Sequence, residues 1–351
     1  QKTTSYQRLH DLPMAKRADA LLKRFDVNGD GLLQRNEFHE FVSTTFPGNA
    51  YAPDALLAAI DADGDGTVGL NELRAFLRVY DPSRSVVRTK SCLVIIDVQN
   101  DFITGSLANQ YGAEPIVPII NSMRDAFDLV VISMDWHPHH HCSFVESAND
   151  GKIALAGGAA ANFTPFSMVT LKGDADRAEH PQMLYPRHAV CDTDGAACHH
   201  ALDVLDSDPK IYKGTKPNID SYSAFFDNCK ANDTGLTALL EAEGITDVYC
   251  CGLVFDICVK SSALHGAEMG FAVTVIEDAC RPLDAANVAG VKDELNAAGV
   301  AIMSAAEAIR KSKADSGQER TLKEFLKVTK RSKAAQALHS SMSMGAHAPS
   351  V

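Results

Sequence analysis

Short apolar runs, separated by longer polar stretches, are the main pattern after residue 91. They cover residues 92–96, 129–134, 248–251, 271–276 and 300–303. Between several of them lie stretches with apolar side chains at helical spacing, such as Thr234–Glu243 and Ile257–Met269. Continuous apolar strands that alternate with amphipathic helices predict a mostly parallel sheet covered by helices on both faces. The fold class over residues 91–310 is therefore α/β, with three α/β/α layers.

Residues 1–80 have a different pattern, in which short amphipathic helices flank two loops rich in Asp and Gly. Apolar side chains recur at helical spacing from Met14 to Phe25, before the first loop, and from Leu70 to Leu77, after the second. This pattern predicts a small all-α domain in front of the α/β domain. The polar residues 81–90 predict a linker between the two.

Two segments follow neither pattern. Residues 145–187 fit the alternation of strands and helices poorly and predict a long loop or lid. Residues 311–351 are basic, rich in Ser, Ala and Met, and short of apolar periodicity, which predicts a mostly disordered tail. A short helix around residues 322–328 and a role as a basic interaction arm are the alternatives for this tail.

Composition narrows the class of protein. The 351 residues carry a formal net charge of −12, and because acidic surfaces repel phosphate backbones we expect no nucleic-acid partner. No apolar run is long enough to span a bilayer, so we expect no membrane partner. Nine cysteines, several inside apolar runs, are typical of a reducing compartment. We expect a cytoplasmic protein and leave the nucleus, a homo-oligomer and a leader before Gln1 open.

Both Asp/Gly-rich loops place oxygen-bearing side chains at the spacing of a calcium loop, with glycine at the sharp turn. The predicted ligands are Asp26, Asn28, Asp30, Leu32, Gln34 and Glu37 in the first loop, and Asp61, Asp63, Asp65, Thr67 and Glu72 in the second. Leu33 and Val68 should form a short β contact between the loops. Residues 12–80 resemble EF-hand pairs, which implies bound calcium. A degenerate pair kept for packing is the alternative, and a static site and a regulatory switch both stay open.

Candidate chemistry lies where predicted strands end, which is where sites of parallel sheets form. Asp97 ends one apolar run, and a buried carboxylate is costly unless it is paired or catalytic. Asp135 and His137 project to one side of an extended segment and can bind one cation, with His188 as a third ligand. Cys258 stands where a strand turns into a helix, whose N-terminus would favour a thiolate and could receive an oxyanion.

Six ordered motifs resemble the isochorismatase-like hydrolases, and within them the nicotinamidases, over roughly residues 91–310. They are Asp97-Val-Gln-Asn-Asp-Phe102, Asp135-Trp-His-Pro-His-His-His-Cys-Ser-Phe144, Pro186-Arg-His188, Lys213-Gly214, Asp220-Ser-Tyr-Ser-Ala-Phe225 and Gly252-Leu-Val-Phe-Asp-Ile-Cys-Val259. The Asp-x-His pair with a later His narrows the resemblance to nicotinamidases, because isochorismatases lack a metal. The resemblance implies hydrolysis of nicotinamide to nicotinate and ammonia in NAD salvage, through a cysteine thioester.

The resemblance also implies a role for each matching residue. Asp97, Lys213 and Cys258 match the catalytic triad. Asp135, His137 and His188 match the ligands of one divalent transition metal, zinc before iron or manganese, and His141 matches a position that binds metal in only some members. Leu253–Val254 matches a cis peptide that presents the Val254 N–H, with that of Cys258, to an oxyanion. Phe102, Tyr185 and Tyr222 match the aromatic walls of the substrate pocket, with Tyr185 standing where many members have Trp.

Two other interpretations stay open. Another hydrolase of the same superfamily, acting on a different small amide or a carbamoyl compound, would share the triad without needing a metal for a pyridine ring. A calcium-binding protein with an inactive hydrolase domain is the alternative from another class, and the complete triad argues against it.

Overall fold

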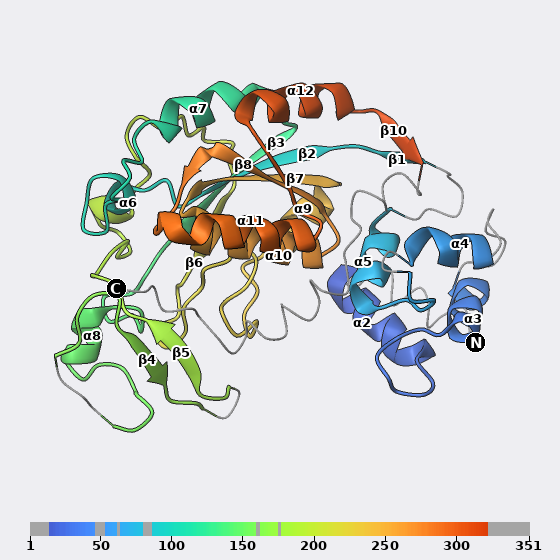
Figure 1. Ribbon diagram of the computed structural model, residues 1–351, viewed down its shortest axis with the longest axis horizontal. Helices are drawn as coiled ribbons and strands as arrows, with labels where there is room; N and C mark the ends of the chain where they lie inside the picture. The colour runs from blue at the N-terminus through green and yellow to red at the C-terminus, as the bar shows by residue number, and fades with distance from the viewer. Residues whose placement is uncertain are drawn as a thin grey trace.

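The computed structural model describes residues 14–45, 53–61, 64–79, 86–158, 162–174 and 177–321. Over these residues a helical region at the N-terminus precedes a larger α/β region (Figure 1). Among the described helices, none combines the length and the apolar character needed to cross a membrane.

Over the described residues, four helices make up the N-terminal region. They are α2 (Met14–Phe25), α3 (Arg35–Thr45), α4 (Pro53–Ile60) and α5 (Leu70–Val79). Their apolar faces bury a separate core, in which the rings of Phe38, Phe41 and Phe76 pack against one another. The expected β contact between the two loops is confirmed, because the N–H groups of Leu33 and Val68 each donate to the carbonyl of the other at 2.9 Å.

A six-stranded sheet lies at the centre of the α/β region. The order across it is β6-β3-β2-β7-β8-β9, and all neighbouring strands are parallel. The strands are β2 (Ser91–Ile96), β3 (Leu129–Asp135), β6 (Lys210–Lys213), β7 (Asp247–Leu253), β8 (Ala272–Arg281) and β9 (Ala301–Met303). The central strands β2 and β7 are buried along their whole length, which is why their sequences are continuously apolar.

Helices cover both faces of this sheet. Helices α7 (Ile116–Met123) and α12 (Ala305–Asp315) lie on one face, and α10 (Lys260–Glu268) and α11 (Val288–Ala297) lie on the other (Figure 1). Other helical segments of the α/β region are α6 (Asn100–Ile103), α9 (Leu236–Ala242), the 3-10 segments η1 (Arg124–Ala126), η2 (Asp194–Ala196) and η4 (Ala285–Asn287), and the π-helical η3 (Phe255–Val259). The predicted three-layer α/β/α fold is confirmed.

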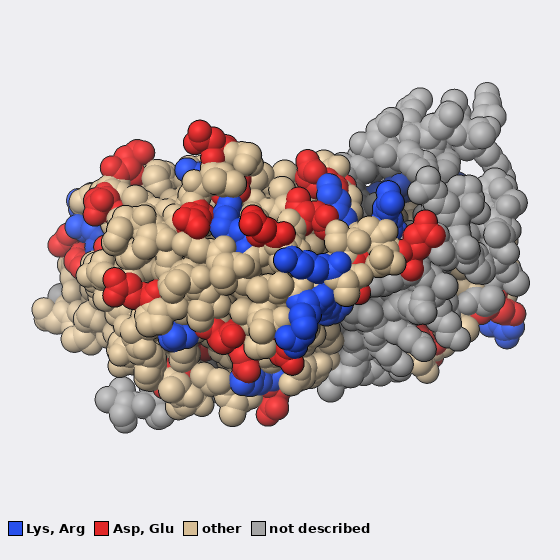
Figure 2. Space-filling model, turned by 90° about the horizontal axis from the view of Figure 1, so that it is seen from above, with Lys and Arg blue, Asp and Glu red and all other residues tan. Residues whose placement is uncertain are grey.

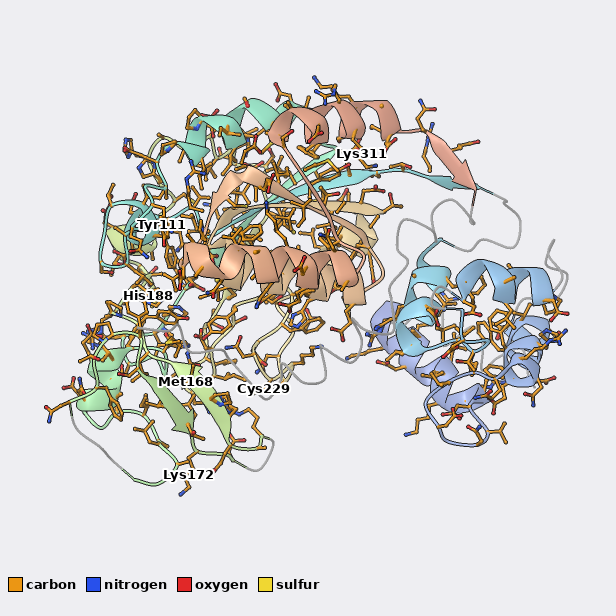
Figure 3. All side chains as sticks on the ribbon, viewed as in Figure 1. Tyr111, Met168, Lys172, His188, Cys229 and Lys311 are labelled. Atoms are coloured by element: carbon orange, nitrogen blue, oxygen red, sulfur yellow. The ribbon has the colours of Figure 1, made fainter. Side chains whose placement is uncertain are left out.

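Residues 145–187 differ from the long loop that the sequence predicts. They contain helix α8 (Val145–Asn149) and an antiparallel pair of strands, β4 (Met168–Leu171) and β5 (His180–Met183). A small apolar cluster of its own holds this segment together. Its members are spread thinly along the sequence, so they produce no regular apolar period. Figure 3 shows His188 between this segment, where Met168 is labelled, and the main sheet.

The borders of the α/β region also differ from the prediction. Val86–Arg88, inside the expected linker, form strand β1, which pairs with β10 (Glu319–Thr321) of the expected tail. Helix α12 also continues to Asp315, beyond the expected border at residue 310. A strand of three residues is too short for an apolar period, and its pairing partner lies far away in sequence. Residues 322–351, with the helix expected around 322–328, lie outside the described residues.

Charged side chains are distributed widely over the surface. Figure 2 shows Asp and Glu side chains interspersed with Lys and Arg on the face seen from above. The chain as a whole has a formal net charge of −12.

Candidate active site

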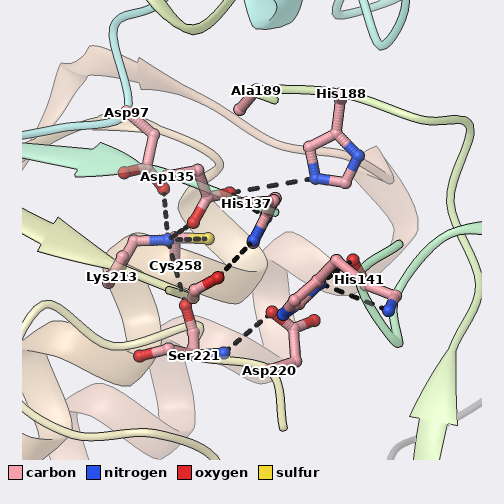
Figure 4. A network of polar contacts seen from close by, with 12 residues as sticks. Asp97, Asp135, His137, His141, His188, Ala189, Lys213, Asp220, Ser221 and Cys258 are labelled. Carbon is pink, nitrogen blue, oxygen red and sulfur yellow. Dashed lines mark hydrogen bonds and ion pairs between the residues drawn. The ribbon is translucent and has the colours of Figure 1, made fainter. Parts of the chain in front are cut away.

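The carboxyl ends of neighbouring parallel strands bring the predicted catalytic residues together. Asp97 directly follows β2, Asp135 ends β3, and Lys213 ends β6. Cys258 lies in η3, the turn that follows β7. Because parallel strands end at the same edge of a sheet, residues far apart in sequence meet at one place, where their side chains point toward one another (Figure 4).

Lys213 is the centre of this group. Its Nζ lies 2.9 Å from Oδ2 of Asp97 and 3.7 Å from Sγ of Cys258. The same ammonium donates to a carboxylate oxygen of Asp135 and, at 3.1 Å, to the carbonyl of Ser221. All three triad residues are buried. A buried ammonium with two carboxylates around it is a fully paired charge, as a stable interior requires.

Burial determines the protonation of the triad. It raises the pKa of Asp97 to about 7, with Lys213 opposing this shift and Asp135 adding to it. Burial also raises the pKa of the Cys258 thiol well above its ordinary range, although Lys213 acts in the opposite direction. For Lys213, burial would lower the pKa, but the carboxylates of Asp135 and Asp97 hold it well above its ordinary range.

Cys258 lies at the start of a helical segment, as the sequence predicted, because the π-helical turn η3 runs directly into α10. Its surroundings nevertheless raise the pKa of the thiol. There burial outweighs the favourable charge of Lys213. The resting group is therefore a thiol beside a carboxyl group, and it must lose a proton to become a nucleophile.

The turn around Cys258 has the predicted backbone. The peptide bond between Leu253 and Val254 is cis, as expected. Val254 is extended, and its carbonyl accepts hydrogen bonds from the N–H groups of Ile257 and Val259, both at 3.1 Å. These bonds fold the turn back over Val254 and hold Cys258 at the end of β7. The use of the Val254 and Cys258 N–H groups as an oxyanion hole stays a prediction.

Asp135, His137 and His188 form a second group beside the triad. The Nε2 atoms of His137 and His188 lie 3.4 Å and 3.9 Å from Oδ2 of Asp135. All three side chains are buried, and each offers one ligand atom within 4.8 Å of the others. The three predicted metal ligands are therefore brought together, although His188 comes from a separate segment.

The donor set of this group fits a divalent transition metal. Nδ1 of His137 donates to the carbonyl of Gly214 at 2.9 Å, and Nδ1 of His188 donates to that of Pro186 at 2.7 Å. Both rings thus turn their Nε2 toward Asp135, the usual arrangement of metal-binding histidines. Burial lowers the pKa of His188 to about 4, so this imidazole is neutral, as a ligand must be. Two nitrogens and one carboxylate suit zinc, iron or manganese.

Gly214 is required at this place because the ring of His137 packs directly against it. A Cβ atom at position 214 would lie 2.3 Å from the Cε1 atom of that ring. The Gly214 carbonyl also accepts the hydrogen bond that orients the ring. The motif Lys213-Gly214 thus supplies a predicted triad residue and the support of a predicted metal ligand from two consecutive positions.

His141 lies beside the predicted metal ligands and has partners of its own. Its ring stacks on His137 with centroids 4.1 Å apart. Nε2 donates to the carbonyl of Ile219 at 3.2 Å, and Nδ1 accepts from the hydroxyl of Ser143 at 2.7 Å. With His137 and Asp220 it forms another buried group that could hold a cation. Both nitrogens are engaged, so a role for His141 as a ligand stays a prediction.

Aromatic rings surround the predicted metal ligands. The rings of Phe102 and Tyr185 lie 5.4 Å and 5.7 Å from that of His188. Tyr222, the third predicted wall, lies close to Tyr185. Sequence reasoning missed Phe144, whose ring lies 5.4 Å from that of His188, and Phe166, which packs on Tyr185 at 6.0 Å. Phe144 ends the motif Asp135–Phe144 and could have been found there, whereas nothing in the sequence indicates a role for Phe166.

The two N-terminal loops have the turns that a calcium loop needs. In the first, the carboxylate of Asp26 accepts from the N–H groups of Gly29 and Gly31, at 2.7 Å and 2.9 Å. Glu37 accepts from Val27 and Gln34, both at 2.8 Å. Corresponding bonds in the second loop run to Asp61 from Asp65 and Gly66, and to Glu72 from Gly69. Of the predicted ligands, Asp63 lies outside the described residues.

Comparison with known proteins identifies the family. The model of the isochorismatase domain family matches residues 91–307, which is more than half of the chain and contains every residue of the triad and the metal-ligand group. The chain belongs to the isochorismatase family. In front of this family domain, the EF-hand family model matches residues 18–42 and 54–77, as the loop spacing predicted.

Within the isochorismatase family, the chain is similar to nicotinamidases. It is 38% identical to a nicotinamidase of Acinetobacter baylyi over 192 residues, which cover 55% of this chain and 81% of that protein. A nicotinamidase and pyrazinamidase of Acinetobacter baumannii has a similar structure, with a TM-score of 0.55 at 33% identity, covering 63% of this chain and 98% of that one. The yeast nicotinamidase bound to the inhibitor nicotinaldehyde gives a TM-score of 0.54 at 30% identity, covering 61% and 99%. The resemblance read from the motifs is confirmed.

Proposed function

We propose that this chain hydrolyses nicotinamide to nicotinate and ammonia, with Cys258 as the nucleophile. The observation that carries the proposal is the position of Lys213, which contacts Asp97 and Cys258 on one side and Asp135 on the other. A nucleophile and a cation-binding group therefore share one buried edge of the sheet. The similarity to nicotinamidases over most of their length supports the same substrate.

In the first half of the reaction, Asp97 accepts the proton of the Cys258 thiol. The sulfur then forms a bond to the amide carbon, and the carbonyl electrons move to oxygen, which the N–H groups of Val254 and Cys258 receive. When the carbonyl re-forms, the carbon–nitrogen bond breaks and Asp97 returns its proton to the leaving nitrogen as ammonia departs. A thioester of Cys258 remains.

In the second half, Asp97 accepts a proton from water, whose oxygen attacks the thioester carbon. The carbon–sulfur bond then breaks, Asp97 passes its proton to the sulfur, and the carboxylic acid leaves and gives its own proton to solvent to become nicotinate. Throughout both halves Lys213 holds Asp97 in place at 2.9 Å and compensates the charge that moves between Asp97 and Cys258. Each residue of the triad is back in its starting state at the end of the cycle.

The remaining residues orient the substrate. Asp135, His137 and His188 would hold a divalent cation, with zinc preferred over iron or manganese, which supplies a Lewis-acid site for the pyridine nitrogen. Phe102, Tyr185 and Tyr222 line the position of the ring, where a flat heteroaromatic group fits between aromatic side chains. His141 supports His137 by stacking.

Ammonia release from a panel of small amides tests this proposal. Wild-type protein should act on nicotinamide, and Cys258→Ala should lose essentially all turnover. Cys250→Ala removes another buried cysteine, in the middle of β7, and should retain it. Preference for a different amide or a carbamoyl compound, with turnover that is indifferent to chelators, would favour the other hydrolases of the superfamily. Turnover by Cys258→Ala would refute the assignment of the nucleophile.

We further propose that the two N-terminal loops bind calcium through the oxygen ligands named above. The loop hydrogen bonds to Asp26, Glu37, Asp61 and Glu72 support this proposal, because they gather the carboxylates around each turn. Calcium titration by calorimetry should detect two sites in the wild type. Glu37→Gln and Glu72→Gln should each remove one of these sites. If neither substitution changes the heat of calcium binding, the proposal is contradicted.

A cytoplasmic location, with the nucleus left open, is also part of the proposal. Its support is that all nine cysteines are free thiols, five of them on strands β2, β7 and β8 or in the turn at Cys258, which is the usage of a reducing compartment.

A further inference from the structure

The side chain of Gln99 holds the backbone of a metal-ligand residue. Its Oε1 accepts from the N–H of Asp135 at 2.9 Å, and its Nε2 donates to the carbonyl of the same residue at 2.8 Å. Nε2 also donates to the carbonyl of Ala196 at 2.8 Å, and the side chain is completely buried. One amide group therefore satisfies both backbone groups of Asp135 at the point where β3 ends.

Asp101, two residues further along, holds the other metal-ligand segment. Its Oδ2 accepts from the N–H of Ala189 at 2.8 Å, directly after His188, and its Oδ1 accepts from Ser106 at 3.1 Å. The carbonyl of Ala189 in turn accepts from the N–H of His137 at 2.9 Å. A continuous series of hydrogen bonds thus connects Asp101 with the segments of both histidines.

The carboxylate of Asp101 packs closely against two glycines, Gly105 and Gly195. A Cβ atom at Gly195 would lie 2.1 Å from Oδ2 of Asp101, and one at Gly105 would lie 2.3 Å from Oδ1. Ala189, which receives its hydrogen bond, has a φ of 45°, a conformation that a residue with a side chain rarely adopts without support. A fixed carboxylate supplies that support here.

We propose that Gln99 and Asp101 are positioning residues that set the spacing of Asp135, His137 and His188, and hence the affinity for the cation. The inference rests on the proposed function only in taking this group as a cation site. The hydrogen bonds of these two side chains do not reach the triad. Gln99 bonds the backbone of Asp135, whereas Asp101 bonds the backbone of Ala189. One short segment after β2 therefore supplies the base of the triad and the support of the neighbouring site.

Zinc binding to the full-length protein tests this inference. The metal-free protein is titrated with zinc in competition with a chromophoric chelator. Asp101→Asn is nearly isosteric, but its single oxygen can serve only one of the two N–H groups, and its amide would face the other. Gln99→Met keeps the volume and loses all three hydrogen bonds. Each substitution should weaken zinc binding by about 10- to 100-fold, the usual cost of losing the support of a metal ligand.

Asp128→Asn is the matched control. This carboxylate also accepts from a backbone N–H, that of Ser91 at 2.8 Å, but at the amino ends of β2 and β3. Asp128→Asn should bind zinc as the wild type does. In metal-free protein, the alkylation rate of Cys258, followed on its own peptide by mass spectrometry, should stay unchanged in Asp101→Asn and Gln99→Met. Turnover of both should recover when zinc is saturating.

Zinc affinity within about twofold of wild type in either folded variant, or an equal loss in Asp128→Asn, would overturn the inference. If one of the two variants does not fold, the other decides. A wild type that binds no zinc would also overturn it. A wild type that binds zinc, with affinity lost in both variants, but that leaves nicotinamide intact would refute the proposed function and support the positioning roles.

Discussion

Lys213 donates a hydrogen bond to Oδ1 of Asp135, so that the other oxygen of this carboxylate, Oδ2, is the one that faces the histidines. The carboxylate of Asp135 therefore connects the predicted triad, through Lys213, to the predicted cation-binding group. Burial opposes ionisation of Asp135, but Lys213 and His137 lower its pKa below the ordinary range. The charge balance of the whole site thus depends on the ammonium of Lys213.

Replacing Lys213 should therefore affect stability as well as turnover. Lys213→Met leaves the buried carboxyl groups of Asp97 and Asp135 without their cation, which should cost about 3–5 kcal/mol of unfolding free energy. Asp97→Asn leaves Lys213 paired with Asp135 and should cost clearly less. Both variants should lose turnover of nicotinamide. Urea unfolding of the metal-free proteins gives the comparison, and equal destabilisation by the two substitutions would contradict this account of the pairing.

The pH dependence of kcat/KM should report the carboxyl group of Asp97. Burial raises its pKa to about 7, so the carboxylate that accepts the thiol proton is present above this pH. Below it the carboxyl group is protonated, and kcat/KM should fall by about tenfold for each further pH unit. Because the pKa of the Cys258 thiol is raised well above its ordinary range, ionisation of this thiol should not add a second rise in kcat/KM near neutral pH.

Steady-state rates with nicotinamide across the range from about pH 5 to pH 8 test this prediction. Saturating metal at each pH keeps the cation-binding group loaded, so that loss of metal is not mistaken for protonation of Asp97. A profile that stays flat through pH 7 would show that Asp97 is ionised throughout or is not the base.

The sequence indicated which candidate residues would lie together better than it indicated their environments. Asp97, Asp135 and Cys258 were found because each follows a strongly apolar run, which marks a buried strand. Strand β6, which carries Lys213, was missed, because it spans four residues whose side chains alternate between exposed and buried. Only the motif Lys213-Gly214 pointed to it. The protonation state of Cys258 could not be predicted, because it depends on burial by residues from several distant segments.

The short strands and the segment with β4 and β5 could not be predicted from local sequence either. Strands β1 and β10 pair across more than half of the chain, and each is three residues long. The segment with β4 and β5 is held by its own apolar cluster. Neither arrangement produces a local apolar period, so both depend on contacts that a single sequence does not display. The proposed supports of the predicted metal ligands, Gln99 and Asp101, are hidden for the same reason, although they lie within the motif Asp97–Phe102.

His188 and His141 should respond differently to substitution. His188→Ala removes a nitrogen that faces Asp135, and should lower zinc affinity by a factor of at least about 100, with a matching loss of turnover at low zinc. His141→Ala removes a ring whose nitrogens bond Ser143 and Ile219, and should change zinc affinity by less than about tenfold. Metal content after dialysis against a chelator measures both, and similar losses from the two would make His141 a full ligand.

The contact between Gly270 and Ala75 joins the EF-hand region to the hydrolase domain. Gly270 lies between α10 and β8, and a Cβ atom there would lie 2.8 Å from the backbone nitrogen of Ala75 in α5. Gly244, after α9, also has a positive φ but no heavy atom within 4 Å of its Cβ position. Alanine at either position bears the conformational cost of a positive φ, about 1–2 kcal/mol, and only position 270 adds a clash with backbone.

Gly270→Ala should therefore destabilise the protein more than Gly244→Ala, by about 1–3 kcal/mol, the usual cost of overpacking. Urea unfolding of the full chain, in calcium, measures the difference. Equal unfolding free energies would mean that α5 moves away from Gly270 at no cost, and thus that the two regions are not held together there. A larger loss at position 270 would show that α5 rests on the turn between α10 and β8.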